Sequence, residues 1–177
     1  MSEVNASQLS VFEGLSHIQL AELRTDHAGE LGAVWIYKGI LFVTKDKELR
    51  EFAEEHLVTE SQHFQFFHGG LPKAYQSLLS PLWKIAGWML GAVPAFFGRN
   101  AVYATIDAVE TFVVQHYEEQ LDIMPTGLRA VLERFMHEEG DHRDEAALKS
   151  QSKNQLRWWR KIVSGGSALA VRASRHL

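Results

Sequence analysis

The stretch Glu60-Ser61-Gln62-His63 has a second copy at Glu139-Gly140-Asp141-His142, and a further glutamate precedes each copy. Glu60 follows Glu30 by 30 positions and Glu139 follows Glu110 by 29, so corresponding residues lie 79 or 80 positions apart. Two single glutamates and two Glu-x-x-His pairs, placed on four helices, form the ligand set of a carboxylate-bridged di-metal centre in a four-helix bundle. The sequence therefore predicts six metal ligands: Glu30, Glu60, His63, Glu110, Glu139 and His142.

Apolar residues recur at intervals of three and four along most of the chain, whereas alternating runs of β-branched residues are scarce. This periodicity predicts helices at about 16–43, 47–68, 100–122 and 127–149. All six candidate ligands fall on the apolar stripe of their helix, where an unpaired carboxylate would be strongly destabilising. Two Glu-x-x-His pairs are close to what composition gives by chance. Their shared place on apolar faces favours a metal centre over a bundle with buried Glu–His hydrogen bonds.

The length and composition fit one folded domain. The chain has 177 residues, of which 46% are hydrophobic and 23% charged, as in a globular protein. We expect an all-α, ferritin-like four-helix bundle over 1–177, with two pseudo-repeats at about 16–68 and 100–149. An additional apolar crossover helix is expected in a segment at about 78–98, and a basic C-terminal helix in a tail at 150–177.

The absence of cysteine excludes disulfides, thiolate metal sites and cysteine nucleophiles. The first 15 residues are polar and acidic and lack the pattern of a signal peptide. Charge is distributed unevenly, because residues 149–177 carry seven of the 18 Lys and Arg residues and none of the 22 acids. Such a basic tail suits an anionic surface, although a solvated basic helix would have the same composition.

The segment between the two repeats is apolar on nearly every side. It runs from Pro81 to Gly98, contains one charged residue, Lys84, and is interrupted by Pro94 and several glycines. Because a membrane-spanning helix needs about 20 apolar residues, we expect a helix that caps the bundle and dips into one leaflet. An ordinary buried crossover helix is the alternative.

Residues three apart share one face of a helix, so each Glu-x-x-His pair can offer a carboxylate and an imidazole to one metal. The glutamate of each pair is also placed to bridge to the second metal, while Glu30 and Glu110 would each bind one. This oxygen-rich set suits two iron ions, and manganese less well. His116 and Tyr117 are candidates to hydrogen-bond a ligand or the substrate, although a core histidine with satisfied hydrogen bonds and a core tyrosine would fit the same pattern. Asp26 and Asp107 are candidates to orient the metal-bound histidines.

Several strings resemble the demethoxyubiquinone hydroxylase family, the di-iron monooxygenases of ubiquinone biosynthesis. They include Asp26-His27-Ala28-Gly29-Glu30, Pro81-Leu82-Trp83 and His116-Tyr117, in register with the two Glu-x-x-His pairs. The resemblance covers roughly residues 20–149. The sequence departs from it at Thr111, where many members have a second glutamate, and at Arg143, where many have a second histidine.

The resemblance implies that the six candidate residues bind iron, and that the protein hydroxylates the ring of a polyprenyl methoxybenzoquinol with dioxygen and two external electrons. It implies a peripheral membrane protein, and we expect the cytoplasmic face of a bacterial inner membrane rather than a mitochondrion. A lipid-presenting partner protein and a homo-oligomer are further candidates as partners. No nucleic acid is expected.

Two other functions are compatible with the sequence. A ferritin-like protein that oxidises iron or handles peroxide would use the same ligands, but it would have a polar exterior, against which the apolar segment and basic tail argue. A non-enzymatic helical adaptor at a membrane surface would keep the buried acids for structure alone. Iron binding distinguishes the adaptor from the other two.

Overall fold

Local sequence signals determine where the bundle helices begin. Ser16 forms a capping box with Gln19: the Ser16 side chain accepts from the Gln19 amide at 3.3 Å, and Gln19 Oε1 accepts from the Ser16 amide at 2.8 Å. Asp46 Oδ1 accepts from the Leu49 amide at 3.0 Å and so caps the next helix.

The computed structural model describes residues 10–150 and 157–177, and within them it contains six α-helices and no strand. The all-α prediction is confirmed, and the four bundle helices begin and end within two residues of the predicted positions. The basic residue Lys153 and most of the N-terminal stretch fall outside the described ranges. The helices are α2 (His17–Val43), α3 (Lys47–Gly70), α4 (Ser80–Phe96), α5 (Arg99–Gln120), α6 (Thr126–Lys149) and α7 (Arg157–Ser174), with short 3-10 turns η1 (Ser10–Phe12), η2 (Lys73–Tyr75) and η3 (Leu121–Ile123).

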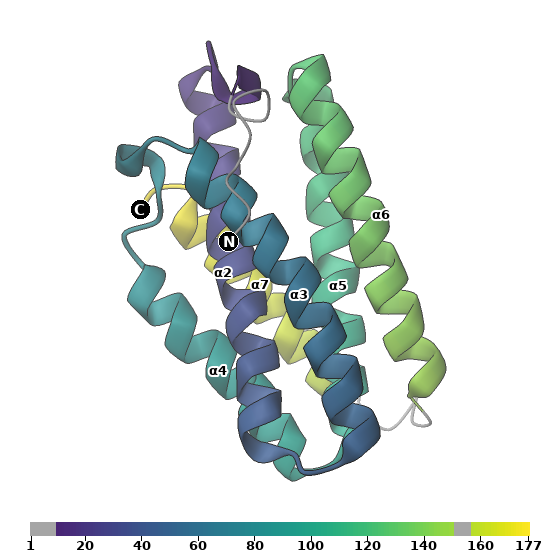
Figure 1. Cartoon of the computed structure of the whole chain (residues 1–177). Helices are drawn as coiled ribbons and strands as arrows, with labels where there is room; N and C mark the ends of the chain where they lie inside the picture. Colours follow the sequence, from purple (N-terminus) through teal and green to yellow (C-terminus); the bar gives the residue numbers. More distant parts are fainter. Residues whose placement is uncertain (1–9, 151–156) are drawn as a thin grey trace.

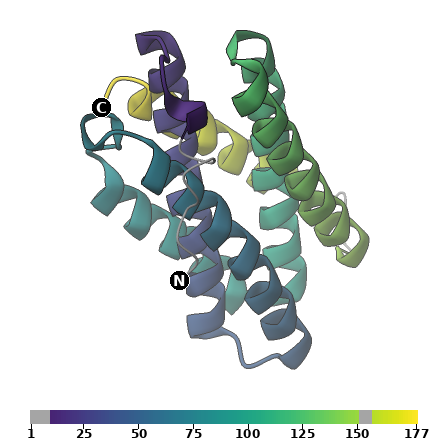
Figure 2. The ribbon, with the colours of Figure 1, turned by 45° about the horizontal axis from the view of Figure 1, so that its top comes forward.

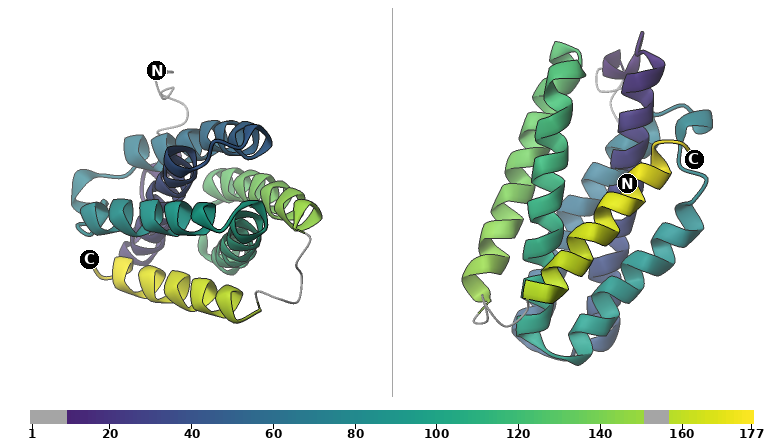
Figure 3. Two further views of the ribbon diagram at one scale, coloured as in Figure 1. Left: turned by 90° about the horizontal axis from the view of Figure 1, so that it is seen from below. Right: turned by 180° about the vertical axis from the view of Figure 1, so that it is seen from behind.

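Helices α2, α3, α5 and α6 form the bundle, and α4 and α7 lie outside it (Figures 1 and 2). α4 packs on α2, while α7 packs on α5 and α2. Seen from behind, α7 runs diagonally across the bundle, and α4 lies on the same side of the molecule (Figure 3). In the part of the chain that is described, no helix is both long and apolar enough to cross a membrane.

Glycines let α4 lie directly on the backbone of α2. A Cβ atom at Gly87 would lie 2.3 Å from the carbonyl oxygen of Gly32, and one at Gly91 would lie 1.9 Å from that of Ile36. Both distances are shorter than any ordinary contact. The glycines that interrupt the apolar segment in the sequence are therefore packing positions within one continuous helix, and Pro94 falls near its end.

Two apolar clusters form the core. One is built around Tyr103 and Ile106, and the other around Phe67 and Leu128. Along each bundle helix the candidate metal ligands lie between a residue of one cluster and a residue of the other, as Glu30 does on α2. The polar centre is thus enclosed by packed side chains at both ends.

Candidate metal centre

The six predicted ligands come together inside the bundle, and each is 8% exposed or less. Their ligand atoms fall into two groups, and within each group all atoms lie within 4.8 Å of one another. The first group is Glu30, Glu60, His63 and Glu139, and the second is Glu60, Glu110, Glu139 and His142. The role of these residues as ligands stays a prediction, but they lie where that role requires them to be.

Glu60 and Glu139 belong to both groups. Two cations held here would therefore share these carboxylates, while Glu30 and Glu110 would each contact one cation. This is the arrangement expected for a glutamate that precedes its histidine by three positions.

Glu139 is the centre of the hydrogen bonding. His63 Nδ1 donates to Glu139 Oε1 at 2.8 Å, and His142 Nδ1 donates to Glu139 Oε2 at 3.0 Å. Glu30 Oε2 lies 3.6 Å from His63 Nδ1 and Glu60 Oε1 lies 3.2 Å from His142 Nδ1. Both nitrogens donate to Glu139 instead, so these two buried oxygen atoms have no hydrogen-bond partner among the described residues. Because burying an unpaired carboxylate oxygen is costly, these two atoms indicate that the cluster is built to receive a further group.

The pKa values of the buried glutamates also indicate that the cluster is built to receive a further group. Burial, and then the charge on Glu139, raise the pKa of Glu60 to about 8. Burial, followed by the same neighbouring charge, also raises the pKa of Glu110. The pKa of Glu139 is lowered because the hydrogen bonds from His142 and His63 outweigh the effect of burial. Without a cation, the cluster can keep only part of its carboxylates ionised.

Two divalent cations would balance the four carboxylates and supply partners for both unpaired oxygens. With one imidazole and several oxygens for each cation, the donor set suits iron or manganese. The residues therefore fit a metal centre.

Side chains around the cluster reach it from α2 and α5. Tyr117 donates a short hydrogen bond to Glu30 Oε1, and Tyr37 donates to Glu110 Oε1 at 3.5 Å. His116 does not contact the cluster; its Nε2 lies 2.7 Å from Thr25 Oγ1. Of the two candidates for a supporting role, Tyr117 contacts a predicted ligand, whereas His116 contacts Thr25 instead.

The expectation that Asp26 and Asp107 orient the metal-bound histidines is wrong. Asp26 is bonded to Gln120 at 2.8 Å and lies 3.3 Å from His116, whereas Asp107 pairs with Arg160 of α7. Both aspartates lie about one helical turn before a predicted ligand on the same stripe, but their partners come from other helices and are not the predicted histidine ligands.

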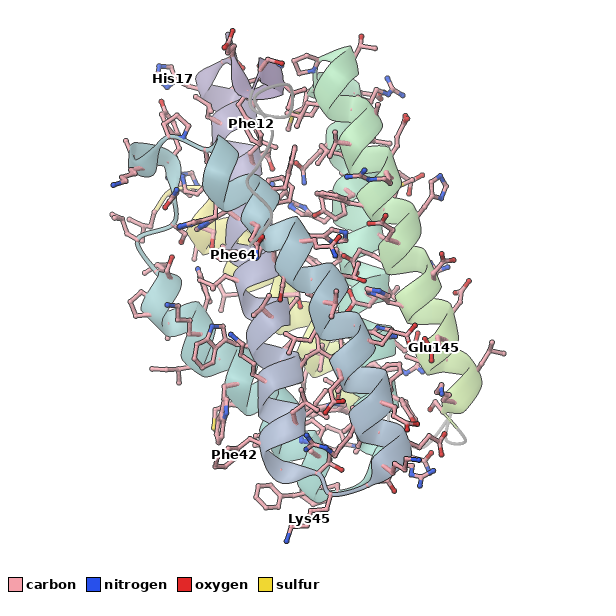
Figure 4. The ribbon with its side chains drawn as sticks, viewed as in Figure 1. Phe12, His17, Phe42, Lys45, Phe64 and Glu145 are labelled. Carbon is pink, nitrogen blue, oxygen red and sulfur yellow. The ribbon has the colours of Figure 1, made fainter. Side chains whose placement is uncertain are left out.

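The residue that orients His63 is Glu138, which the sequence did not single out. Glu138 Oε2 lies 2.6 Å from His63 Nε2, so Nδ1 is left facing the cluster. A carboxylate on the distal nitrogen is a common support for a metal-bound histidine. Similarly, Glu145 of α6 (Figure 4) lies 2.9 Å from the Nε2 of the buried His56. The only sequence signal for Glu138 is its place next to Glu139.

A cavity of about 340 Å³ connects the cluster with α4 and α7. At its inner end are Glu30, Glu60, Glu110 and Glu139, and its walls are mostly apolar or small residues. α4 contributes Trp83 and Leu90, and α7 contributes Ile162, Val163 and Ala170 among others. The two helices outside the bundle therefore form the walls of a space that ends at the candidate metal centre.

Comparison with known proteins identifies the family. The profile described as "Ubiquinone biosynthesis protein COQ7" matches residues 18–174. The chain belongs to the COQ7 family. The match includes all six predicted ligands and also α4 and α7, so both the candidate metal centre and the walls of the cavity lie within the part of the chain that matches the family.

Curated relatives carry related names. The chain is 36% identical over 128 residues to a 3-demethoxyubiquinol 3-hydroxylase of Rhodospirillum rubrum, covering 69% of this chain and 60% of the relative. It is 35% identical to a mitochondrial NADPH-dependent 3-demethoxyubiquinone 3-hydroxylase of Dictyostelium discoideum, covering 68% and 59%. A protein of the same name from Caenorhabditis elegans is 29% identical, covering 84% and 85%. The match to the first two thus spans about 60% of their length.

Proposed function

We propose that this COQ7-family chain is a di-iron monooxygenase that hydroxylates the ring of a polyprenyl methoxybenzoquinol in ubiquinone biosynthesis. The observation that carries this proposal is the apolar cavity that ends at the buried Glu–His cluster. A protein that only oxidises ferrous ions needs no apolar space of this size beside its metal ligands. A lipid-soluble substrate does, and the names of the relatives point to the same substrate class.

Iron would be held by Glu30, Glu60, His63, Glu110, Glu139 and His142, and two ferrous ions would supply the activation of dioxygen. In the overall reaction one ring C–H bond becomes C–OH. One oxygen atom enters the ring, and the other leaves as water with two electrons from an external donor and two protons.

The protein's own side chains fix the orientation of the predicted metal ligands and shield the cluster from water. The Tyr117 hydroxyl holds Glu30 in one orientation by donating to Oε1, and Glu138 does the same for His63. The aromatic ring of Phe135 stacks on His63 at a centroid distance of 3.9 Å. These contacts keep bulk water away from the cluster and fix its donors before the substrate enters.

The substrate would reach the cavity from a membrane surface. The outer sides of α4 and α7 expose large apolar side chains, among them Ile85 at 64% and Ile162 at 55%. Lys84 and Lys161 stand beside them and are exposed. Apolar side chains with neighbouring lysines favour peripheral binding to an anionic bilayer.

The test combines metal, oxygen and quinol. The chain is titrated anaerobically with ferrous iron and then given oxygen with a demethoxyubiquinol analogue or without it. We expect two iron ions per chain and a product with one additional ring oxygen, labelled when ¹⁸O₂ is used. Oxidation of iron at the same rate without the analogue, and no ring product with it, would instead assign a ferroxidase. Failure to bind two ferrous ions would overturn both assignments.

Membrane binding is tested separately by flotation with anionic phospholipid vesicles. Ile85→Ser and Ile162→Ser are expected to reduce the bound fraction. The matched control is Val58→Ser, because Val58 is 58% exposed on α3, away from α4 and α7. Equal binding by all three variants would contradict the membrane-facing role of these two helices.

A further inference from the structure

One end of the cavity is polar, at the place where α2, α5 and the end of α7 meet. Thr25, Asp26, His116 and Ser174 all line the cavity there. The C-terminal end of α7 is held next to α2 because Arg175, just after the helix, pairs with Glu22 of α2 through contacts of 2.7 and 2.8 Å. None of these side chains is a predicted metal ligand.

Hydrogen bonding within this polar end accounts for most of its atoms. Thr25 Oγ1 donates to the carbonyl oxygen of Glu22 at 2.6 Å, so it can only accept from His116 Nε2 at 2.7 Å. His116 therefore carries a proton on Nε2. Gln120 Nε2 donates to Asp26 Oδ1 at 2.8 Å. The side chains are thus held in place, and Asp26 Oδ1 already has its donor.

Among Thr25, Asp26, His116 and Ser174, which line the cavity at its polar end, two side chains each have one atom without a partner. Asp26 Oδ2 and Ser174 Oγ are buried and have no hydrogen-bond partner among the residues that the structure describes. Asp26 is 3% exposed and Ser174 is 1% exposed, so bulk water does not satisfy them. Unpaired buried polar atoms beside a cavity indicate a ligand group that completes their hydrogen bonds.

The chemistry of the two atoms specifies that group. A carboxylate oxygen only accepts, while a serine hydroxyl can donate as well as accept. A hydroxyl group on the ligand satisfies both, by donating to Asp26 Oδ2 and accepting from Ser174. A carbonyl oxygen would satisfy only Ser174 and would face the aspartate with a second acceptor. The Gln120 amide nitrogen can only donate, so Asp26 Oδ1 acts as an acceptor. Burial raises the pKa of Asp26, and the hydrogen bonds from His116 and Gln120 oppose that rise.

We propose that Asp26 and Ser174 bind a ring hydroxyl of the substrate, and thereby select the reduced quinol over the oxidised quinone. This inference rests on the proposed function. Asp26 precedes Glu30 by one helical turn on the same face of α2, which is about 6 Å along the axis. A ring held by its hydroxyl at Asp26 directs its opposite edge toward Glu30. The apolar walls of α4 and α7 then enclose the isoprenoid tail.

The experiment measures binding, not turnover. The full chain, prepared without iron so that neither ligand form changes its redox state, is studied anaerobically by equilibrium dialysis. The ligands are a short-chain demethoxyubiquinol and the corresponding quinone. We expect the wild-type chain to bind the quinol about tenfold more tightly, as the loss of one hydrogen bond to a buried charged group implies.

Two variants and a control locate the effect. Asp26→Asn keeps the shape but can present an amide donor to the cavity, so the quinol-to-quinone preference should fall by about tenfold or reverse. Ser174→Ala should weaken quinol binding by a smaller factor. Ser164→Ala removes a hydroxyl from α7 at a position outside the cavity lining and should leave the preference unchanged. Circular dichroism confirms that each variant is folded.

The outcomes separate this proposal from the function on which it rests. Equal affinity of the wild-type chain for quinol and quinone, or a preference for the quinone, would overturn the role of Asp26 and leave the hydroxylase assignment intact. An unchanged preference in both Asp26→Asn and Ser174→Ala would also overturn it. Binding of neither ligand form by the wild-type chain would overturn the proposed substrate class itself.

Discussion

Gly91→Ala tests whether the backbone contact between α4 and α2 holds the wall of the cavity in place. A Cβ atom at Gly91 would lie 1.9 Å from the carbonyl oxygen of Ile36 and 2.7 Å from its carbonyl carbon. Ordinary van der Waals contact begins at 3.4 Å, so the helices would have to separate locally by about 1.5 Å. The obstacle is backbone, which cannot turn aside as a flexible side chain can.

Two effects of opposite sign determine the size of the change. Alanine is favoured over glycine inside a helix by about 0.5–1 kcal/mol. Forcing an extra methyl group into a well-packed interface costs about 1–3 kcal/mol and occasionally more. With a backbone clash this short, the cost should lie at the upper end of that range. We therefore expect Gly91→Ala to lower the free energy of unfolding by about 2 kcal/mol.

Urea denaturation followed by circular dichroism measures this change, with Gly140→Ala as the matched control. Gly140 is also inside a helix, but a Cβ atom there would have no neighbour within 4 Å. The control should therefore gain about 0.5–1 kcal/mol. If Gly91→Ala proves as stable as Gly140→Ala, with equal m-values, the close packing of α4 on α2 is wrong.

Three further predictions concern the centre and its surroundings. Glu139→Ala removes the carboxylate shared by both donor groups. It should leave the helical content unchanged but abolish the binding of two iron ions in an anaerobic titration. Full retention of iron would contradict the shared role of Glu139. Glu138→Ala removes the support of His63 Nε2 and should weaken iron affinity by about 10–100-fold, whereas an affinity equal to wild type would rule that support out. Burial, and then the charge of His68, lowers the pKa of His27 to about 4 from 6.5. Between these values the unfolded chain binds a proton that the folded chain does not, so stability should fall as the pH drops from 6.5 to 4, by up to about 1.4 kcal/mol per pH unit. Urea unfolding at several pH values should show a shallower dependence for His27→Gln, and equal slopes would refute the assignment.

The bundle and its six candidate ligands could be predicted from the sequence because both follow from helical periodicity. Residues three apart share a helix face, so any helix that contains Glu60 and His63, or Glu139 and His142, places the two side chains next to each other. Their place on apolar stripes directed all of them inward. The structure brings these side chains into one cluster with no change to the predicted set.

The supporting contacts could not be predicted in the same way, because they join helices far apart in the sequence. Asp26 and Asp107 have the right spacing to support metal-bound histidines, yet the packing of α2 against α5 and of α5 against α7 gives them Gln120 and Arg160 as partners. Glu138 supports His63 across an interface between two helices. Periodicity states which face of a helix is buried, but not which residue of another helix that face meets.

The sequence by itself determined that this protein is a helical bundle with a duplicated, inward-facing Glu and Glu-x-x-His pattern, since spacing and polarity along one helix are local properties. Only the tertiary structure decided what surrounds that pattern. The glycines of α4 fix one wall of the cavity against α2, and α7 adds the other wall together with Ser174. Cavity shape and unpaired buried atoms depend on how six helices pack at once, and no single helix encodes that.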